Sequence, residues 1–544
     1  MGTRVTALVW VFSLAFALLG YRFYDVQLSH GDYYGKQAEG ANLFGNYLIP
    51  KRGSIYFSDK DGERVPAAVN KEYPVVYAVP SEIEDPATTA ATLAPIIEVK
   101  SRGDLEALLS KKGDPFEPIL ERPTEAQTEA IQGAALKGIY INSGLDRFYP
   151  LGKTGAHILG FTSTNEALWL GKYGIESYYN QILGGTPGEA NGDRVTKPVN
   201  GKDIQLTIDT NIQSHAEEII SKLVEENRGV GGMIIVAEPK TGKILAMTSY
   251  PNFDPNAYSE FDIGSFLNPA VQSVYEPGSV FKVITMASAI DAGKITPETT
   301  FYDSGELTLN GFTIRNWDKK SYGTVTMATV LEKSLNMGAA FVERQMGHES
   351  FYEYVTKFGF KDQTQIDLPG EVTGSLLPLE QDKRDINFAT ASFGQGISTT
   401  PIRLLMSIAA IANGGELMRP YLNAGNKAQK MGRTISRDAS DEIIGMMVSA
   451  VDNVGTANIS GYTVAGKTGT AQIPKDNGAG YTDDFINTYI GFAPAYEPRF
   501  IILVRLDKPY GGLLAGLTVV PTFRDLAQYI INYYNIPPDR IDIE

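Results

Sequence analysis

Beyond about residue 200, the chain alternates short strand-like stretches with longer stretches of helical apolar spacing. Residues 203–209 alternate apolar and polar side chains as a half-buried strand does, and helical spacing follows behind a threonine cap at Thr210. The stretches 232–237 and 244–249 flank a segment with proline and glycine, which predicts a β-hairpin. Near the C-terminus we predict three more strands and a closing amphipathic helix, at 462–466, 488–492, 500–506 and 523–534.

Helical spacing dominates the middle of this half, from residue 280 to about 414. Strands at both ends of a helical middle predict an α+β fold, in which helices pack on an antiparallel sheet. The preceding region, residues 25–205, is polar and rich in turns, with a strand-like run at 73–79 and an acidic, alanine-rich, helical-looking middle at 81–133. Because no titratable cluster stands out in this region, we interpret it as a spacer or docking domain.

The first residues carry a topological signal. Residues 5–19 are apolar on all sides, close to the lower limit of about 17 residues for spanning a bilayer. Tyr21, Phe23 and Tyr24 follow where an interfacial aromatic belt would lie. A cleaved signal peptide is the alternative, with residues 15–17 as a small-x-small site. We predict one membrane span at residues 1–24 and an exported body, since no later stretch is comparably apolar.

Composition narrows the function. A chain of 544 residues with 43% hydrophobic and 20% charged residues is typical of a globular protein of two or more domains. The net charge of −15 argues against a nucleic-acid partner. The absence of cysteine excludes disulfides, thiolate catalysis and cysteine-ligated zinc. The four histidines are far apart in the sequence, so we expect no metal and no cofactor, and a serine enzyme here would use a base other than histidine.

The first candidate for chemistry is Ser279, which follows Pro277-Gly278 and precedes an apolar run that predicts a buried helix. In the first turn of that helix, free backbone amides and the helix dipole favour developing negative charge. Lys282 lies three residues later and therefore on the same face. A neutral lysine there could take the hydroxyl proton of Ser279 if burial and a nearby cation disfavour its charged form. By itself this pattern more often marks a helix cap and a solvated lysine.

The second candidate is Ser334 with Asn336, between two helical stretches. A hydroxyl and an amide two residues apart can face one cleft from a tight turn, where the hydroxyl could relay a proton and the amide could hold a substrate carbonyl. This pattern is weak by itself.

The third candidate is Lys467-Thr468-Gly469-Thr470, at the end of a strand-like run. The lysine supplies positive potential, the threonines offer hydroxyls to a carboxylate, and the glycine lets a substrate backbone come close. Lys-Thr-Gly also occurs at 153–155 and 240–242, but only Lys467 follows the other two elements in order and is flanked by strand pattern.

The order Ser-x-x-Lys, Ser-x-Asn, Lys-Thr-Gly links the chain to penicillin-binding proteins and serine β-lactamases. Over nearly its whole length, the sequence resembles class B penicillin-binding proteins, most of all the septal, FtsI-like branch. It departs from the family at Leu335, often a serine, and at Arg403, often a glutamine. Further segments that carry the resemblance are Lys51-Arg-Gly-Ser-Ile55, Arg147-Phe-Tyr-Pro150, Gly174-Ile-Glu-Ser-Tyr-Tyr179, Tyr250-Pro251, Phe393-Gly-Gln-Gly396 and Gly491-Phe-Ala-Pro494.

The resemblance implies a mechanism. Ser279 would attack the carbonyl between the two terminal D-alanines of a peptidoglycan stem peptide, with Lys282 as general base. The backbone amides of Ser279 and Thr470 would form the oxyanion hole. Ser334 would help protonate the leaving D-alanine, and Asn336 would hold Lys282 and the substrate amide. Lys467 would bias the local field while Thr468 and Thr470 bind the terminal carboxylate. A β-lactam would acylate Ser279 and hydrolyse slowly.

The resemblance also implies the organisation of the chain. Residues 1–24 would be a transmembrane anchor, 25–205 an elongated pedestal or dimerisation domain, and 206–544 a transpeptidase domain with the penicillin-binding and serine β-lactamase-like fold. The protein would be a single-pass membrane protein with its catalytic domain on the extracytoplasmic side. Its pedestal would dock a membrane-embedded glycan polymerase and division proteins. The alternatives are an elongation-type transpeptidase, a D,D-carboxypeptidase or β-lactamase-like enzyme, and a β-lactam sensor.

Overall fold

The computed structural model describes residues 43–44, 47–111, 117–165, 168–191, 194–475 and 480–540, and six single positions before them. Those six, between Trp10 and Tyr24, are helical and exposed; the rest of the predicted anchor lies outside the described residues. Within the described part of the chain, no helix has both the length and the apolar character needed to cross a bilayer.

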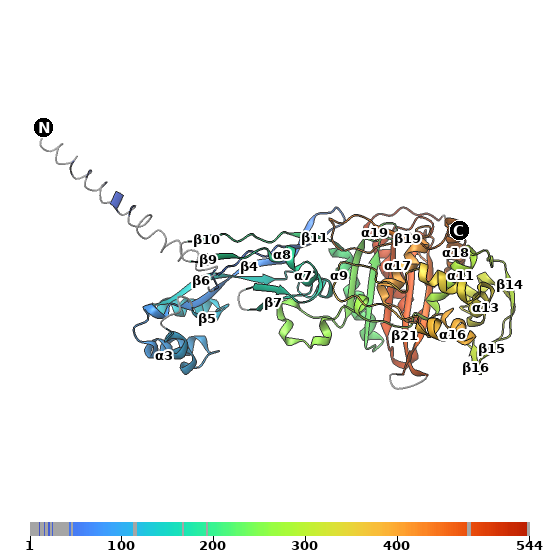
Figure 1. Cartoon of the computed structure of the whole chain (residues 1–544), viewed down its shortest axis with the longest axis horizontal. Coiled ribbons are helices and arrows are strands. Elements are labelled where there is room, and N and C mark those ends of the chain that lie inside the picture. Colours follow the sequence, from blue (N-terminus) through green and yellow to red (C-terminus); the bar gives the residue numbers. More distant parts are fainter. Residues whose placement is uncertain are drawn as a thin grey trace.

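The molecule is elongated, with an N-terminal part and a larger C-terminal part that follow one another along its long axis (Figure 1). The C-terminal part is built on a five-stranded sheet in the order β13-β12-β22-β21-β20, in which every neighbouring pair is antiparallel. Its strands are β12 (Gly231–Ala237), β13 (Ile244–Tyr250), β20 (Ala465–Pro474), β21 (Tyr481–Ala493) and β22 (Phe500–Asp507). The predicted hairpin is confirmed, whereas β20 begins later than the pattern at 462–466 predicts.

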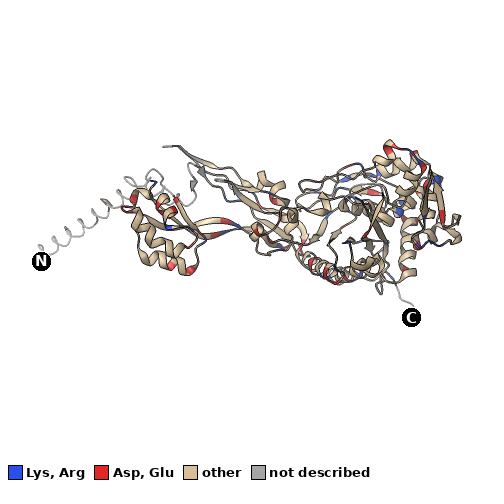
Figure 2. Cartoon of the chain, turned by 90° about the horizontal axis from the view of Figure 1, so that it is seen from below, with Lys and Arg blue, Asp and Glu red and all other residues tan. Residues whose placement is uncertain are grey.

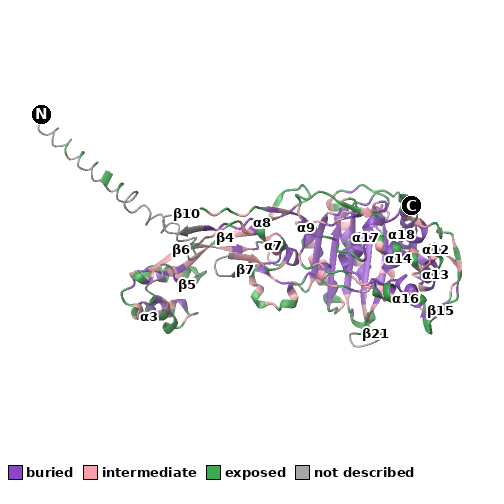
Figure 3. Ribbon diagram, viewed as in Figure 1, coloured by how far each residue is buried: buried purple, intermediate pink, exposed green. Residues whose placement is uncertain are grey.

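Helices cover both faces of this sheet, and the interior between the layers is buried (Figure 3). On β22, Ile501 and Leu503 belong to one apolar cluster, and Ile502 and Val504 belong to another. Successive strand residues point to opposite faces, so both faces of β22 are apolar and each needs a helical layer. These observations confirm the predicted antiparallel sheet with helices. One face carries α9 (Thr210–Glu226) and α19 (Val519–Tyr533), and the other carries α11 (Phe281–Asp291), α17 (Pro401–Ala412) and α18 (Arg437–Val454).

One local prediction for this part is wrong. The cap of α9 is Asp209, whose carboxylate accepts the backbone N–H groups of Asn211 and Ile212, while Thr210 is the first helical residue. Helices dominate the stretch 280–414, as predicted, but four short strands that we did not predict interrupt it. They are only partly buried, so they lack the clean apolar alternation that identifies a strand in a sequence. The strands are β14 (Thr300–Asp303), β15 (Glu306–Leu309), β16 (Phe312–Arg315) and β17 (Gly323–Thr326).

The other elements of the C-terminal part surround this frame. The helices are η4 (Pro255–Glu260), η5 (Ile263–Phe266), α10 (Pro269–Gln272), η6 (Gly278–Val280), α12 (Met327–Glu332), α13 (Asn336–Met346), α14 (His348–Lys357), α15 (Leu377–Gln381), α16 (Asp385–Ala391), η7 (Tyr510–Gly512) and η8 (Ala515–Leu517). The strands are β18 (Glu416–Met418) and β19 (Lys430–Arg433).

The N-terminal part is organised around the long strand β4 (Arg64–Ala78), which pairs along its length with β6 (Ile139–Phe148). At one end, three helices and β5 form a small head with its own apolar core, in agreement with the helical character predicted for 81–133. At the other end, β11 (Ile204–Asp209) pairs with β3 (Ile55–Ser58), so the division expected at 205/206 falls inside a strand of this sheet. The head contains α3 (Pro86–Ile97), α4 (Arg102–Leu109), α5 (Glu125–Ala134) and β5 (Glu117–Glu121).

The shorter elements of the N-terminal part lie before and between these. They are β1 (Leu43–Phe44), β2 (Tyr47–Leu48), α6 (Ala156–Leu159), β7 (Thr162–Asn165), β8 (Leu168–Gly171), α7 (Gly174–Tyr178), α8 (Asn180–Gly184), β9 (Gly188–Asn191) and β10 (Arg194–Thr196). Acidic and basic residues are distributed over both parts of the molecule (Figure 2).

A buried ion cluster joins three segments of the N-terminal part. Glu176 is fully buried, and its two oxygens each lie 2.6 Å from an arginine Nε, that of Arg52 and that of Arg147. Buried charges are tolerated only when paired and hydrogen-bonded, so these three side chains fix one another. Nearby, Tyr179 Oη donates to Asp367 at 3.0 Å and thereby ties the N-terminal part to the C-terminal part.

Candidate active site

Ser279 lies in the 3₁₀ turn η6 that leads into α11, as the Pro-Gly pair before it predicts. Gly278 adopts a positive φ of 58°, a conformation that side chains rarely adopt. Its N–H donates to the carbonyl of Gly394 at 3.1 Å, which fixes the turn against the segment 393–396. The turn that carries Ser279 is therefore held by a backbone hydrogen bond to this segment.

The amine of Lys282 contacts the hydroxyl of Ser279. Its Nζ lies 2.9 Å from Ser279 Oγ, 3.1 Å from Ser334 Oγ and 2.6 Å from the Ser334 carbonyl oxygen. The side chain is fully buried. Burial, and next the positive charge of Lys467, hold the pKa of Lys282 well below its usual range. A neutral amine at this place can accept the proton of the Ser279 hydroxyl.

Ser334 occupies the turn between α12 and α13 in a left-handed conformation, with a φ of 54°. For a residue other than glycine this conformation costs about 1 kcal/mol or more, and such residues cluster at functional sites. The adjoining Leu335 is fully buried and anchors the turn. The hydroxyl of Ser334 lies between two amines, 3.1 Å from Lys282 Nζ and 3.0 Å from Lys467 Nζ. Ser334 thus connects the two lysines.

Lys467 comes from β20, one of the two edge strands of the sheet. Its Nζ donates to Ser334 Oγ and, at 3.1 Å, to the carbonyl oxygen of Thr468. Burial lowers the pKa of Lys467 to about 7. Two lysines that share one hydroxyl cannot both be charged without a large penalty, so each disfavours the ionisation of the other.

Gly469 brings β20 against the turn of Ser279. A Cβ at Gly469 would lie 3.0 Å from the carbonyl oxygen of Pro277 and 3.0 Å from Val280 Cγ2. Thr468 Oγ1 lies 3.4 Å from Lys467 Nζ, and Thr470 Oγ1 lies 3.5 Å from the backbone nitrogen of Ala515. As an edge strand, β20 also has backbone amides that are not paired within the sheet.

Asn336 is the one predicted residue whose contacts differ from the expectation. It is the first residue of α13, and its Nδ2 donates to the carbonyl of Arg315 at 2.9 Å. Among the described residues, the hydrogen-bond partners of Lys282 are Ser279 and Ser334, and Asn336 is not one of them. The position that we expected Asn336 to take next to Lys282 is occupied by the main-chain carbonyl of Ser334.

Glu276 was missed by the sequence reasoning. It lies three residues before Ser279, and its carboxylate accepts the Gly396 N–H at 3.1 Å and the Tyr481 hydroxyl at 3.1 Å. Burial raises the pKa of Glu276. The motif at 393–396 could have suggested a nearby partner, but nothing in the sequence identifies that partner as Glu276. In the part of the chain that the structure describes, no cluster of three or more histidine, aspartate or glutamate side chains could hold a metal ion.

Comparisons with known proteins agree with this geometry. Residues 232–528 match the family described as penicillin binding protein transpeptidase domain, and residues 47–210 match the penicillin-binding protein dimerisation domain. Stage V sporulation protein D of Bacillus subtilis is 33% identical over 91% of this chain and 80% of its own length. Peptidoglycan D,D-transpeptidase FtsI of Escherichia coli is 28% identical over 97% of this chain and 91% of its own length.

Among solved structures, penicillin-binding protein 2X of Streptococcus thermophilus superposes with a TM-score of 0.73 over 90% of this chain and 81% of its own. At 24% identity this likeness concerns the fold alone. The transpeptidase match covers more than half of the chain, and it contains the Ser279, Ser334 and Lys467 elements in one cleft. The chain therefore belongs to the class B penicillin-binding proteins, the FtsI-like family of D,D-transpeptidases.

Proposed function

We propose that this protein cross-links peptidoglycan stem peptides through an acyl-enzyme on Ser279. The observation that carries the proposal is the short chain of contacts from Ser279 Oγ to the buried amine of Lys282 and on to Ser334 and Lys467. A serine hydroxyl becomes a nucleophile when an adjacent group can take its proton. The lowered pKa of Lys282 supports that role at neutral pH.

In the first half-reaction, Ser279 Oγ attacks the carbonyl carbon between the two terminal D-alanines, and its proton passes to Lys282. The backbone N–H groups of Ser279 and Thr470 stabilise the oxyanion. Ser334 relays a proton to the departing D-alanine amine, because its hydroxyl lies within hydrogen-bond distance of both lysines. The products are free D-alanine and an ester on Ser279.

The remaining residues of the site bind the donor peptide. Thr468 and Thr470 hold the terminal carboxylate beside the positive potential of Lys467. Gly469 lets the peptide lie close to β20. The side chain of Asn336, held by Arg315, binds a substrate amide, which keeps one of the two roles expected for it. An amine from a second stem peptide then attacks the ester and forms the cross-link. A β-lactam acylates Ser279 in the same way.

Labelling with fluorescent penicillin tests this assignment. Wild-type protein is expected to form a stable adduct that Ser279→Ala abolishes. Ser288→Ala is the matched control, since Ser288 lies on the same helix and its hydroxyl donates only to the Ile284 carbonyl. Labelling that survives Ser279→Ala would disprove the nucleophile, and rapid loss of intact drug would favour a β-lactamase.

We further propose that residues 1–24 anchor the protein in the membrane, that its catalytic domain is extracytoplasmic, and that it works at the division septum with a glycan polymerase docked on the N-terminal part. The likeness to FtsI of Escherichia coli and the apolar run at 5–19 support this proposal. Depletion in the native host is expected to give filaments; rounded cells would instead identify an elongation enzyme. Recovery of the protein in the soluble fraction after cell lysis would contradict the anchor.

A further inference from the structure

The carboxylate of Glu276 connects three segments of the active site. One of its oxygens accepts the Gly396 N–H at 3.1 Å, and the other accepts the Tyr481 hydroxyl at 3.1 Å. Glu276 lies three residues before Ser279, Gly396 belongs to the segment 393–396, and Tyr481 is the first residue of β21. One side chain thus joins the turn of the nucleophile, this segment and the β20–β21 hairpin.

Two of these three segments are also joined by backbone hydrogen bonds. Tyr275 and Thr399 exchange both of their backbone hydrogen bonds, at 3.0 and 2.9 Å. The Gly278 N–H donates to the Gly394 carbonyl at 3.1 Å. Glu276 lies between these contacts, so the turn of the nucleophile and the segment beside it hold together without its side chain.

The contact of the turn with β20 is of a different kind. Gly469 leaves room for the carbonyl of Pro277, and Ala471 lies against Gly278. These are packing contacts between strand and turn. Among the described residues, the hydrogen bond from Tyr481 to Glu276 is the one that ties the β20–β21 hairpin to residues 276–279. The separation of hairpin and turn therefore depends on this side chain.

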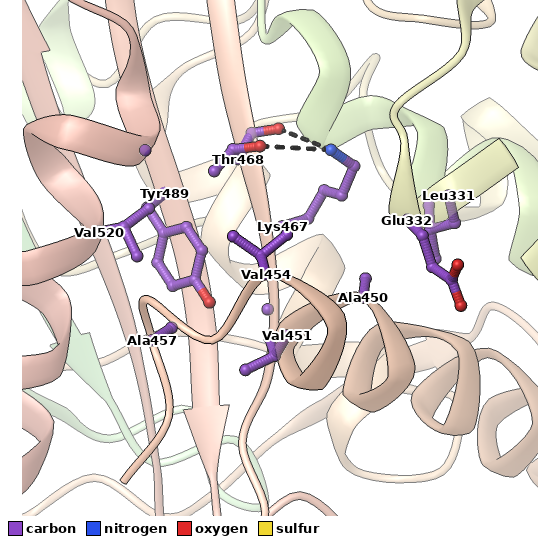
Figure 4. Close-up of a pocket in the computed structure, with 12 residues that line it drawn as sticks. Leu331, Glu332, Ala450, Val451, Val454, Ala457, Lys467, Thr468, Tyr489 and Val520 are labelled. Carbon is purple, nitrogen blue, oxygen red and sulfur yellow. Dashed lines mark hydrogen bonds between the residues drawn. The ribbon is translucent and has the colours of Figure 1, made fainter. Parts of the chain in front are cut away.

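That separation matters for the oxyanion hole of the proposed function, which takes the N–H of Ser279 from the turn and the N–H of Thr470 from β20. Such donors must lie about 2.7–3.1 Å from the developing oxyanion to stabilise it. The substrate carboxylate, in contrast, binds to β20 alone, where Lys467 Nζ also contacts the carbonyl and hydroxyl oxygens of Thr468 (Figure 4). A change in the separation therefore affects the chemical step more than binding.

We propose that Glu276 is a positioning residue for acylation, whose ionised carboxylate holds the β20–β21 hairpin at the distance from Ser279 that the oxyanion hole requires. This inference rests on the proposed function. The donors that Glu276 binds are a backbone N–H and a phenol, both neutral. Hydrogen bonds to an ionised carboxylate are roughly twice as strong as those to a neutral acceptor. Protonation of Glu276 therefore weakens the tie to Tyr481.

The electrostatic surroundings of Glu276 make its protonation measurable. Burial raises the pKa of Glu276, so it loses its charge at a higher pH than an exposed glutamate does. Burial also raises the pKa of Tyr481, so its hydroxyl keeps its proton and remains a donor. The charged groups on adjoining elements have partners of their own: Arg505 with Asp507 on β22, beside the ring of Tyr275, and Lys282 and Lys467 at Ser334. The hold on the hairpin thus weakens as pH falls through the pKa of Glu276.

Stopped-flow acylation of the full-length protein in detergent by fluorescent penicillin separates the dissociation constant of the drug from the rate constant of acylation. Glu276→Gln keeps the shape of the side chain but not its charge. At about pH 8 we expect its acylation rate constant to be about tenfold lower than that of the wild type, and the dissociation constant to change less than about threefold. A wild-type rate constant in this variant would overturn the inference.

The pH profile distinguishes positioning by the charge from a general loss of structure. As pH falls from about 8.5 to 4.5, the wild type itself becomes protonated at Glu276, so the ratio of the two rate constants should fall toward one. Protonation of Lys282 acts on both proteins and cancels in this ratio. A ratio that stays constant over the whole range would overturn the inference. Asp483→Asn removes an exposed carboxylate from the same strand and should change neither constant at any pH.

Tyr481→Phe tests the tie to the hairpin alone, since the contact of Glu276 with Gly396 remains. It should lower the acylation rate constant about threefold at high pH, and by less in the Glu276→Gln background, because both changes act on one contact. If Glu276→Gln does not fold, as circular dichroism would reveal, Tyr481→Phe decides, and wild-type acylation by it would overturn the inference. A wild-type protein that penicillin does not acylate would instead refute the proposed function itself.

Discussion

Glu343, on the helix α13 that begins at Asn336, is expected to make the stability of the protein depend on pH. Its side chain is fully buried, and neither carboxylate oxygen has a hydrogen-bond partner among the described residues. Burial, followed by the negative charge of Asp385, raises the pKa of Glu343 from 4.5 to about 7. His348 Nε2 lies 3.7 Å from this carboxylate and 3.6 Å from that of Asp385. The native state therefore keeps a proton on Glu343 that the unfolded chain releases.

The sign of the effect follows from proton linkage. Between pH 4.5 and about 7, the native state binds more protons at Glu343 than the unfolded state does, so stability falls as pH rises through this window. One pKa unit corresponds to about 1.4 kcal/mol, which gives a loss of up to about 3 kcal/mol above pH 7.

Urea unfolding of wild type and Glu343→Gln at several pH values between 5 and 8.5 measures the effect. Glutamine keeps the shape of the side chain and cannot ionise, so the variant should gain stability relative to wild type as pH rises, by about 2–3 kcal/mol in all. Glu349→Gln, an exposed carboxylate on the next helix, is the matched control and should show no such trend. Parallel stability curves for wild type and Glu343→Gln across this range would refute the reasoning.

Three further predictions follow from single contacts. Lys467→Ala removes the charge that helps to keep Lys282 neutral, so the acidic limb of the pH profile of penicillin acylation should move to higher pH; an unmoved limb would show that the two amines are not coupled. Gly469→Ala places a methyl group 3.0 Å from the backbone of the nucleophile turn and should slow acylation about tenfold or more, whereas Gly445→Ala, which meets open space, should be neutral in the same assay. Glu176→Ala leaves two arginines buried without their carboxylate and should cost about 3–5 kcal/mol in thermal unfolding, and a loss below about 1 kcal/mol would contradict the buried-pair argument.

The strands of the C-terminal sheet could be predicted from the sequence because their apolar residues are nearly continuous. On β12 and β22 both faces are buried, and runs of β-branched and aliphatic residues are the expected sign. The order of the strands could not be predicted in the same way. β12 pairs with β22, which comes from the far end of the chain, and no local pattern of residues specifies that partner. The strands β14 to β17 were missed because their side chains alternate too weakly between buried and exposed.

The contacts within the candidate site could likewise be predicted only in part from the sequence. The spacing of Ser279 and Lys282 predicts their contact, because three residues make about one helical turn. The spacing of Ser334 and Asn336 predicts that both lie near the cleft but not which atom reaches Lys282. That depends on the left-handed φ of Ser334, and a serine in the sequence does not indicate this conformation. The carbonyl oxygen of Ser334 therefore makes the contact with Lys282 that sequence reasoning assigned to the side chain of Asn336.

The different roles of Lys282 and Lys467 follow from the tertiary structure alone. Both amines contact the Ser334 hydroxyl, and burial lowers the pKa of both, that of Lys467 to about 7. The positive charge of Lys467 lowers the pKa of Lys282 further. When one of the two amines carries a proton, it is therefore that of Lys467, and Lys282 is left neutral as the base. The base and the electrostatic partner are thus set by burial and by the contact between the two lysines, which the two lysine motifs do not encode by themselves.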